Sequence, residues 1–231
     1  MKIIKSFKSL TKFELCLWIM SLAGVLASGI VSGFENKLEV CASLVGVTAL
    51  IFVAKGNVLG QILTVIFGLF YGYISFAFRY YGEMITYLGM TAPVALLAVI
   101  SWIKNPYDRE KQEVKVNHLS LYETIIMFIT SAAVTIVFYF ILDFFNTANL
   151  MLSTLSVMTS FLASYLTFRR SPYYALAYAA NDIILIALWI YASFYNIDYL
   201  SMVICFAMFL ANDIYGYVNW TKMKKRQAQG K

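Results

Sequence analysis

The sequence predicts an all-α integral membrane protein with about eight transmembrane helices, and three observations support this fold class. Of the 231 residues, 61% are hydrophobic and only 13% are charged, whereas soluble domains carry about 25% charged residues. Apolar runs recur along the whole chain, and most approach the roughly 20 residues that a helix needs to cross the hydrocarbon core. No segment shows the sustained alternation of apolar and polar residues that a transmembrane β-barrel requires.

The first span is expected to be retained and not cleaved. It follows a basic N-terminal segment, as in a signal peptide, but it is a full membrane span and lacks an obvious small-residue cleavage site. Seven further runs follow, of which Val40–Ala54 is the shortest and needs Leu38 and other flanking residues to cross the membrane. The eight expected spans are Leu15–Phe34, Val40–Ala54, Gly56–Phe78, Met84–Ile103, Thr124–Leu142, Phe144–Phe168, Ser171–Ile197 and Tyr199–Thr221.

A polar stretch from Lys104 to Ser120 separates the two halves of the chain. It carries charges of both signs, Pro106 and the sole histidine, His118, and a linker is the simplest interpretation. We interpret His118 as a solvated loop residue, because no second histidine exists to pair with it. The three cysteines are an odd number without a CxxC pair, which argues against a disulfide framework or a metal site.

The basic residues predict the orientation in the membrane. If the N-terminus is cytoplasmic, 16 of the 18 lysines and arginines fall on the cytoplasmic side, and only Lys37 and Arg79 fall outside. Cytoplasmic loops carry an excess of lysine and arginine, so both termini and the Lys104–Ser120 stretch are expected in the cytoplasm. The net charge of +6 is then explained by the basic cytoplasmic segments that orient the protein in the membrane. Nucleic-acid binding is not expected, because no soluble domain is present to carry it.

The two halves of the chain look like repeats. When the chain is aligned with itself so that Lys55 matches Arg169, the span lengths and loop positions coincide without a gap. Few of the aligned residues are identical. One extra helix lies between the two three-helix units, so the units have the same orientation, as in parallel transporter repeats. We therefore expect a leading helix and then a 3+1+3 arrangement. The expected segments are 1–38 (cytoplasmic N-terminus and leading helix), 39–104 (first repeat), 105–120 (cytoplasmic loop), 121–147 (connecting helix), 148–222 (second repeat) and 223–231 (basic cytoplasmic tail).

The tetrapeptide Ala-Asn-Asp-Ile occurs once in each of the last two spans, at 180–183 and 211–214. Its aspartates, Asp182 and Asp213, are the only charges inside the apolar runs. A charge at membrane depth costs at least about 2.5–3.5 kcal/mol, so such a residue faces a cavity or a partner and not lipid. The two aspartates lie at similar depth on adjacent antiparallel spans, and we expect them to face one cavity. An interfacial helix cap is the alternative for Asp213.

Amides and aromatic rings share helical faces near these acids. Tyr178, Asn181 and Trp189 lie on one face of the seventh span. Gln61 and Tyr71 lie on one face of the third span. Such groups suit a flat, hydroxylated organic cation or a neutral heterocycle, because amides donate and accept hydrogen bonds and aromatic faces attract cations. The alternative is that the amides only bridge helices. The candidate substrate-binding residues are Gln61, Tyr71, Tyr178, Asn181, Asp182, Trp189 and Asn212.

No catalytic residue, cofactor or metal site is expected. The chain has no GxxxxGK[ST], HExxH or GxSxG motif. An enzyme needs a nucleophile–base pair or a set of metal ligands at depth, and none is visible in the sequence. A passive transporter of a small molecule is therefore the preferred interpretation, and a membrane enzyme or partner-binding scaffold is the alternative.

Several short motifs resemble those of a known family. They are Lys55-Gly56-Asn57 followed by Gln61, Tyr71-Gly72-Tyr73, Arg79-Tyr80-Tyr81-Gly82-Glu83, Arg169-Arg170, Asn181-Asp182, Trp189 and Asn212-Asp213-x-x-Gly216-x-x-Asn219-Trp220. Together these motifs resemble the PnuC family of bacterial nicotinamide riboside transporters over about residues 40–222.

The resemblance implies a fold similar to the SWEET sugar transporters, a homotrimer, and a bacterial cytoplasmic membrane location. It also implies import of nicotinamide riboside by facilitated diffusion for NAD synthesis, with Gln61 and Asn181 at the substrate and Asn212 and nearby aromatic residues as further candidates. Tyr174 and Tyr178 stand where tryptophans are expected in Trp-rich members. Another vitamin or nucleoside, such as thiamine, riboflavin or a deoxynucleoside, is therefore the alternative substrate.

Overall fold

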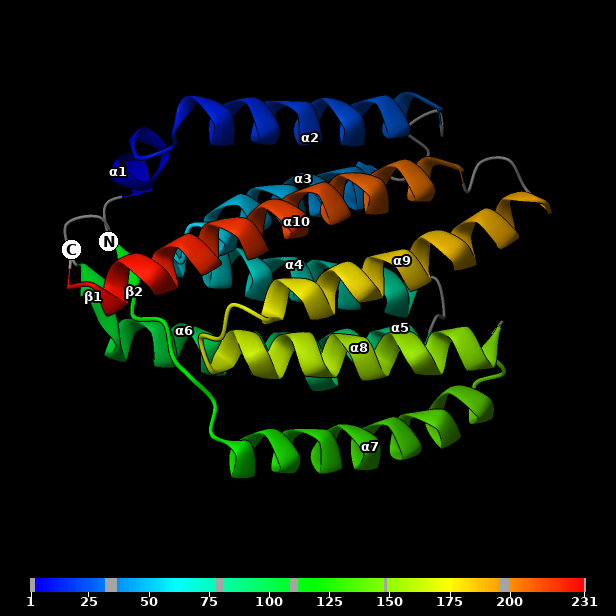
Figure 1. Ribbon diagram of the computed structural model, residues 1–231. Helices are drawn as coiled ribbons and strands as arrows, with labels where there is room; N and C mark the ends of the chain where they lie inside the picture. Colours follow the sequence, from blue (N-terminus) through cyan, green and yellow to red (C-terminus); the bar gives the residue numbers. More distant parts are fainter. Residues whose placement is uncertain are drawn as a thin grey trace.

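The computed structural model describes residues 3–31, 37–77, 81–108, 112–147, 149–195 and 200–230. These residues form a bundle of long helices that run side by side along one axis (Figure 1). The elements are α1 (Ile3–Lys8), α2 (Lys12–Val31), α3 (Lys37–Ala54), α4 (Val58–Ala77), α5 (Tyr81–Thr86), the π-helical segment η1 (Tyr87–Thr91), α6 (Ala92–Lys104), β1 (Pro106–Asp108), β2 (Glu113–Val114), α7 (Leu121–Phe144), α8 (Leu150–Phe168), α9 (Tyr174–Ser193) and α10 (Leu200–Ala228).

The expected all-helical membrane protein is confirmed. Within the described residues, seven helices are long and apolar enough to cross a membrane. One of them is Met84–Lys104, in which α5, η1 and α6 follow one another without a break. Val40–Ala54, within α3, is apolar but shorter. Arg79 and Tyr80, named above, lie outside the described residues, as do Phe34, Phe78, Ile197 and Tyr199, which bound expected spans.

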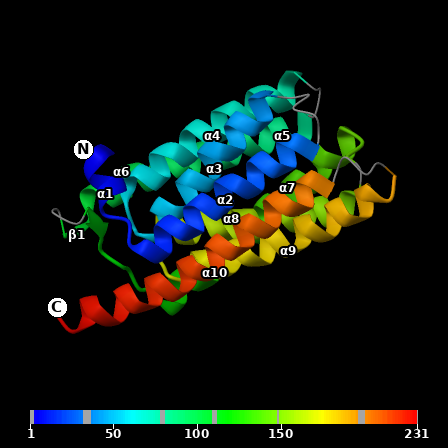
Figure 2. The ribbon, with the colours of Figure 1, turned by 90° about the horizontal axis from the view of Figure 1, so that it is seen from above.

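Six of the described helices form a closed ring. In order around the ring they are α3, α4, α6, α8, α9 and α10, each packed against the next, and α10 packs against α3. The first and second expected repeats contribute three helices each. Outside the ring, α2 packs against α3 and α10 (Figure 2), and α7 packs against α8 at the opposite edge of the bundle (Figure 1). The ring therefore encloses the space in which a site can form.

Two corresponding helix ends have the same backbone geometry. After α3, Gly56 has a left-handed φ of 66°, and the next N–H, that of Asn57, donates to a carbonyl five residues earlier. After α8, Arg170 has a φ of 58°, and the N–H of Ser171 donates to the carbonyl five residues before it. A left-handed residue with this hydrogen bond ends many helices, and glycine adopts it without strain. Gly56 and Arg170 are 114 positions apart, which is also the separation of Lys55 and Arg169.

Two buried tryptophans link these helix ends across the ring. The indole N–H of Trp220, on α10, donates to the Val53 carbonyl at 2.9 Å. The indole N–H of Trp102, on α6, donates to the Thr167 carbonyl at 2.9 Å. Their ring centroids are 5.5 Å apart, and both side chains are buried. The last helix of each expected repeat is thus bonded to the end of the first helix of the other.

The Lys104–Ser120 stretch is more ordered than a simple linker. It contains the short antiparallel hairpin β1–β2, and His118 is exposed as expected. Glu113 forms an ion pair with Arg226 and accepts a hydrogen bond from the Gln227 side chain at 2.8 Å. Gln112 accepts a hydrogen bond from Ser6 on α1. The hairpin therefore joins the N-terminal helix to the C-terminal helix at one end of the bundle (Figure 1).

Glu14, at the start of α2, is another buried acid that the sequence analysis did not single out. It is 2% exposed. Its carboxylate lies 2.8 Å from the Lys55 ammonium and accepts a hydrogen bond from the Tyr215 hydroxyl at 2.7 Å. The charge is thus compensated inside the protein, and the group ties α2 to the end of α3 and to α10.

Candidate binding pocket

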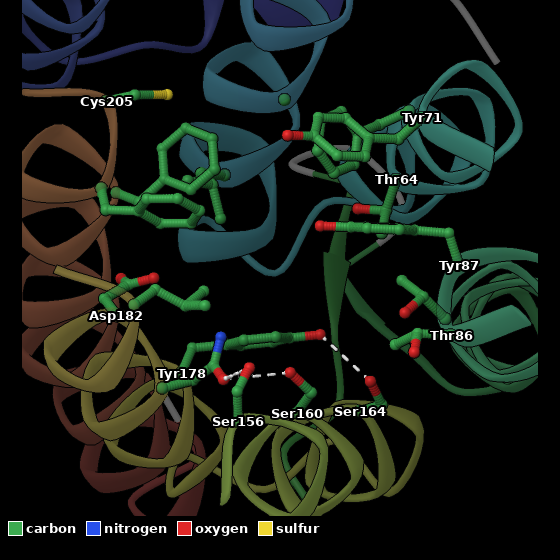
Figure 3. A pocket seen from close by; sticks show the side chains of 18 of the residues that line it. Thr64, Tyr71, Thr86, Tyr87, Ser156, Ser160, Ser164, Tyr178, Asp182 and Cys205 are labelled. Atoms are coloured by element: carbon green, nitrogen blue, oxygen red, sulfur yellow. Dashed lines mark hydrogen bonds between the residues drawn. The ribbon is translucent and has the colours of Figure 1, made fainter. Parts of the chain in front are cut away.

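A pocket of about 220 Å³ lies inside the ring of helices. Figure 3 shows Thr64 and Tyr71 of α4, with Thr86 and Tyr87, on one side, and Ser156, Ser160 and Ser164 of α8 on another. Asp182 of α9 and Cys205 of α10 lie along the remaining wall. The lining therefore draws polar and aromatic groups from both expected repeats.

The Asn181 amide is held by three hydroxyl groups of α8. Its Oδ1 atom accepts hydrogen bonds from Ser156 at 3.0 Å, Thr159 at 2.9 Å and Ser160 at 3.1 Å. This cluster of three hydroxyl groups holds the amide in place, with Oδ1 toward α8. Its Nδ2 atom donates to none of the described residues. Asn181 therefore presents a fixed hydrogen-bond donor to the pocket.

Gln61 offers a second amide from the opposite repeat. It lies on α4, is 2% exposed and lines the pocket. No hydrogen bond joins its side chain to the described part of the chain. A buried amide without partners is costly, so both its donor and its acceptor remain available to a polar molecule in the pocket.

The π-helical segment brings further side chains to the wall. The Ala92 N–H bonds to the Tyr87 carbonyl, five residues earlier, and Pro93 has no N–H with which to continue an α-helical ladder. Short π-helical segments of this kind are frequent at functional sites. Tyr87 and Thr91 line the pocket, and the Tyr87 ring lies 4.6 Å from that of Tyr71. Both tyrosines lie across the pocket from Tyr178 (Figure 3).

The two aspartates of the repeated tetrapeptide meet in the pocket. Asp182 and Asp213 both line it, and each is 3% exposed. They lie on adjacent helices, α9 and α10, and share one wall of the pocket. Asp213 lies well inside α10 and does not cap a helix end. Among the described lining residues there is no lysine, arginine or histidine, and these two aspartates are the only acidic residues.

Six of the seven candidate residues line this pocket, namely Gln61, Tyr71, Tyr178, Asn181, Asp182 and Trp189. Asn212 does not. Its buried amide donates to Ser21 on α2 at 2.8 Å and to the Met208 carbonyl at 2.8 Å. One residue corresponds to about 100° of helix rotation, so Asn212 points to α2 while Asp213 points into the ring. Asn212 therefore bridges two helices, as membrane amides often do.

Tyr174 also lies away from the pocket, although it shares a helical face with Tyr178. Its buried ring packs 5.1 Å from that of Trp220. Tyr174 misses the pocket because it is the first residue of α9. At that level of the bundle, Trp102 and Trp220 fill the space inside the ring.

The serine stripe of α8 was missed by the sequence analysis. Ser153, Ser156, Ser160 and Ser164 recur every three or four residues and line the pocket. This spacing places them on one helical face, so the signal was present in the sequence. The residues of η1 had a weaker signal, because only the position of Pro93 indicates an irregular helix there. Within the described residues, no group of three or more His, Cys, Asp or Glu is placed to hold a metal ion.

Comparison with known proteins gives a consistent result. Residues 36–222 match the family described as "Nicotinamide mononucleotide transporter". The chain is 29% identical over 226 residues to the "Nicotinamide riboside transporter PnuC" of Neisseria mucosa, with 96% of this chain and 86% of the relative covered. It is 23% identical over 193 residues to the protein of the same name from Haemophilus influenzae, with 83% and 82% covered.

A solved structure is also similar. It is the crystal structure of the vitamin B3 transporter PnuC, which is 28% identical in sequence, has a TM-score of 0.77 and is matched over 94% of both chains. Since the family match spans most of the sequence and the relatives align over more than four-fifths of each chain, this protein belongs to the PnuC family of membrane transporters.

Proposed function

We propose that this protein carries nicotinamide riboside across the bacterial cytoplasmic membrane. The observation that carries the proposal is the pocket enclosed by the ring of helices, with amides, hydroxyls and aromatic rings in its wall. A carboxamide and a ribose need both donors and acceptors, which Asn181 and Gln61 supply. The rings of Tyr178 and Tyr71 offer faces to a flat, positively charged pyridinium ring.

The charge of the pocket favours the riboside over the mononucleotide. Proteins bind phosphate through arginine, lysine or the N–H groups at a helix N-terminus. None of the described lining residues is a lysine, arginine or histidine, while two are aspartates. A phosphate group in this pocket would lack a partner and would lie near two acids, so we propose that the riboside is the transported species.

We propose that transport is facilitated diffusion between two repeats. The matching turns after α3 and α8, and the reciprocal bonds of Trp102 and Trp220, support a SWEET-like 3+1+3 architecture with the segment boundaries given above. In parallel repeats, the substrate site lies where the repeats meet, and rocking of one against the other gives alternating access. The proposed assembly is a homotrimer with both termini in the cytoplasm. No catalytic step is assigned to the pocket.

Uptake by purified protein in vesicles tests this function. Labelled nicotinamide riboside should enter vesicles that contain the protein alone, without ATP or another protein, and an excess of unlabelled riboside should compete. Nicotinamide mononucleotide at the same concentration should not compete. Uptake no faster than in protein-free vesicles would reject the proposal, and equal competition by the mononucleotide would reject the choice of substrate.

A further inference from the structure

The two acids of the pocket differ from Glu14, another buried acid among the described residues. Glu14 is paired with Lys55 at 2.8 Å and accepts a hydrogen bond from Tyr215. Asp182 and Asp213 share the pocket wall, and no cationic side chain lies among the described residues of that wall. The charge of Glu14 is thus compensated, whereas the described part of the pocket wall offers no positive side chain to Asp182 and Asp213.

The orientation of Asp182 also indicates a missing partner. Its Oδ2 atom is buried and has no hydrogen-bond partner among the described residues, and the side chain as a whole is 3% exposed. Figure 3 shows the carboxyl group at the wall of the pocket. Buried carboxyl oxygens are normally hydrogen-bonded or paired with a cation. Apart from the neighbouring carboxyl group of Asp213, a group that enters the pocket is the candidate for that role.

We propose that the Asp182–Asp213 carboxyl pair is the subsite for the positive ring charge of the substrate. The proposal rests on the proposed function and assigns the recognition of charge to two residues. Asn181 precedes Asp182 on α9, and its fixed Nδ2 donor also serves the pocket. One short stretch of helix thus offers a donor for a carboxamide oxygen and a negative group for the pyridinium nitrogen.

The pair also accounts for the repetition of the tetrapeptide. The two copies place one carboxyl group on each of two adjacent antiparallel helices, and both groups line the same pocket. The asparagines of the two copies have different locations. Asn181 lines the pocket, whereas Asn212 lies outside it and donates a hydrogen bond to Ser21. Of the two repeated polar residues, only the acid has the same location in both copies, so the acid is the feature with a shared role.

The experiment compares two ligands that differ in charge alone. Nicotinamide riboside carries a positive ring nitrogen. Benzamide riboside has a carbon atom at that place and keeps the flat aromatic ring, the carboxamide and the ribose, but it is uncharged. Affinities are measured by calorimetry on purified wild-type protein. Attraction between a cation and a nearby carboxylate in a protein interior is large enough that we expect about ten- to a hundredfold tighter binding of the cationic ligand.

Two conservative variants locate the effect. In Asp182→Asn and Asp213→Asn, the side chain keeps its shape but loses its charge, and the preference for the cationic ligand should fall by about tenfold or more. The matched control is Thr64→Val, which removes an uncharged polar group from the same pocket. It should change the two affinities by a similar factor and leave their ratio unchanged.

Each result has one interpretation. Equal affinity of the wild-type protein for the two ribosides would overturn the proposed subsite while leaving the transport function intact. An unchanged ratio in both asparagine variants would do the same. No binding of nicotinamide riboside to the wild-type protein would overturn the proposed function itself. If neither asparagine variant folds, the comparison of the two ligands on the wild-type protein still decides.

Discussion

At the scale of single residues, the orientation of one amide decides what the pocket can recognise. Three hydroxyls of α8 bond to Oδ1 of Asn181, which leaves a donor toward the pocket and no acceptor. A carbonyl oxygen of a ligand fits this arrangement, and an N–H does not. Gln61 has no such constraint and can meet either kind of group. We therefore expect Asn181 to bind an acceptor atom of the ligand, whereas Gln61 can bind either a donor or an acceptor.

We expect Asn181→Ala to weaken nicotinamide riboside binding by about 5- to 150-fold, because a hydrogen bond lost in a desolvated pocket costs roughly 1–3 kcal/mol. Asn219→Ala is the matched control. Its amide donates to the Ala54 carbonyl at 2.8 Å and lies outside the pocket, so affinity should change little. Calorimetry on monodisperse protein measures both. Wild-type affinity in Asn181→Ala and in Gln61→Ala would show that the site lies elsewhere.

Thr159 provides a test of orientation. It donates to Asn181 at 2.9 Å but does not itself line the pocket, so it can influence a ligand only through Asn181. Thr159→Val keeps the shape and removes the hydroxyl, and we expect affinity to fall by about two- to tenfold, as for a typical hydrogen bond. In a double-mutant cycle, the same change should have no effect once Asn181 is alanine. Equal losses in both backgrounds would contradict a positioning role.

The sequence allowed most of these residues to be placed, and the exceptions have physical reasons. Helical spacing brought Tyr178, Asn181 and Trp189 to one face correctly. Helical spacing could not predict that Asp213 faces the pocket while Asn212 faces α2. Tertiary packing decides which helix lies on each side of α10. Glu14 was not predicted as a buried residue because it follows a basic segment. An acid next to such a segment is usually interpreted as a solvent-exposed residue that flanks the span.

At the scale of elements, close contact between α4 and the π-helical segment shapes the aromatic side of the pocket. A Cβ atom at Gly72 would lie 2.4 Å from Cδ2 and 2.5 Å from Cγ of Leu88, and one at Gly68 would lie 3.1 Å from Cβ of Ala92. These two glycines therefore permit the approach of the segment that carries Tyr87 and Thr91. Hydropathy predicted a span here but not its π-helical turn, which depends on the missing N–H of Pro93 and on this packing.

We expect Gly72→Val to destabilise the protein by about 1–3 kcal/mol, the usual cost of overpacking. It should also weaken riboside binding, because the added side chain presses on Leu88 of η1, the segment that carries Tyr87 and Thr91. Thermal unfolding in detergent and calorimetry measure the two effects. The control is Gly89→Ala in the same segment, where an added Cβ would meet only Ile85 at 3.7 Å. Equal stability of Gly72→Val and Gly89→Ala would refute the packing argument.

At the scale of the whole molecule, the apolar runs predicted the helices, but they could not predict which helices meet. The closed ring from α3 to α10 follows from contacts between residues far apart in the chain, such as Trp102 with Thr167 and Trp220 with Val53. From the sequence, a tryptophan at the end of a span is interpreted as an anchor at the membrane interface. In the structure, Trp102 and Trp220 instead link buried helix ends. The hairpin at Lys104–Ser120 was missed for a similar reason, since its partners lie in α1 and α10.

The orientation of the whole bundle gives a topology prediction. The hairpin, α1 and the end of α10 lie at one end of the bundle, and the turn between α7 and α8 lies at the other (Figure 1). His118 and Asn146 are exposed at these two ends. In a protein whose three cysteines are replaced by alanine, a membrane-impermeant maleimide on intact cells should label Asn146→Cys and not His118→Cys. The reverse pattern would invert the proposed orientation.

The last prediction concerns the driving force for uptake. A facilitator of a singly charged cation should respond to membrane potential and to nothing else. Moving one charge through 100 mV is worth about 2.3 kcal/mol, which corresponds to about a fiftyfold concentration ratio. Vesicles with an imposed interior-negative potential should therefore accumulate nicotinamide riboside by about this factor, whereas uncharged benzamide riboside should only equilibrate.

The same vesicles separate this mechanism from ion exchange. If Asp182 and Asp213 exchanged a proton for each substrate cation, no net charge would move, and accumulation would follow an imposed pH gradient in place of the potential. Among the described residues, no ion pair joins either acid to a basic side chain, which is why we expect the potential to act alone. Accumulation that follows a proton or sodium gradient at zero potential would show that transport is coupled, and that the acid pair has a role beyond recognition of the substrate.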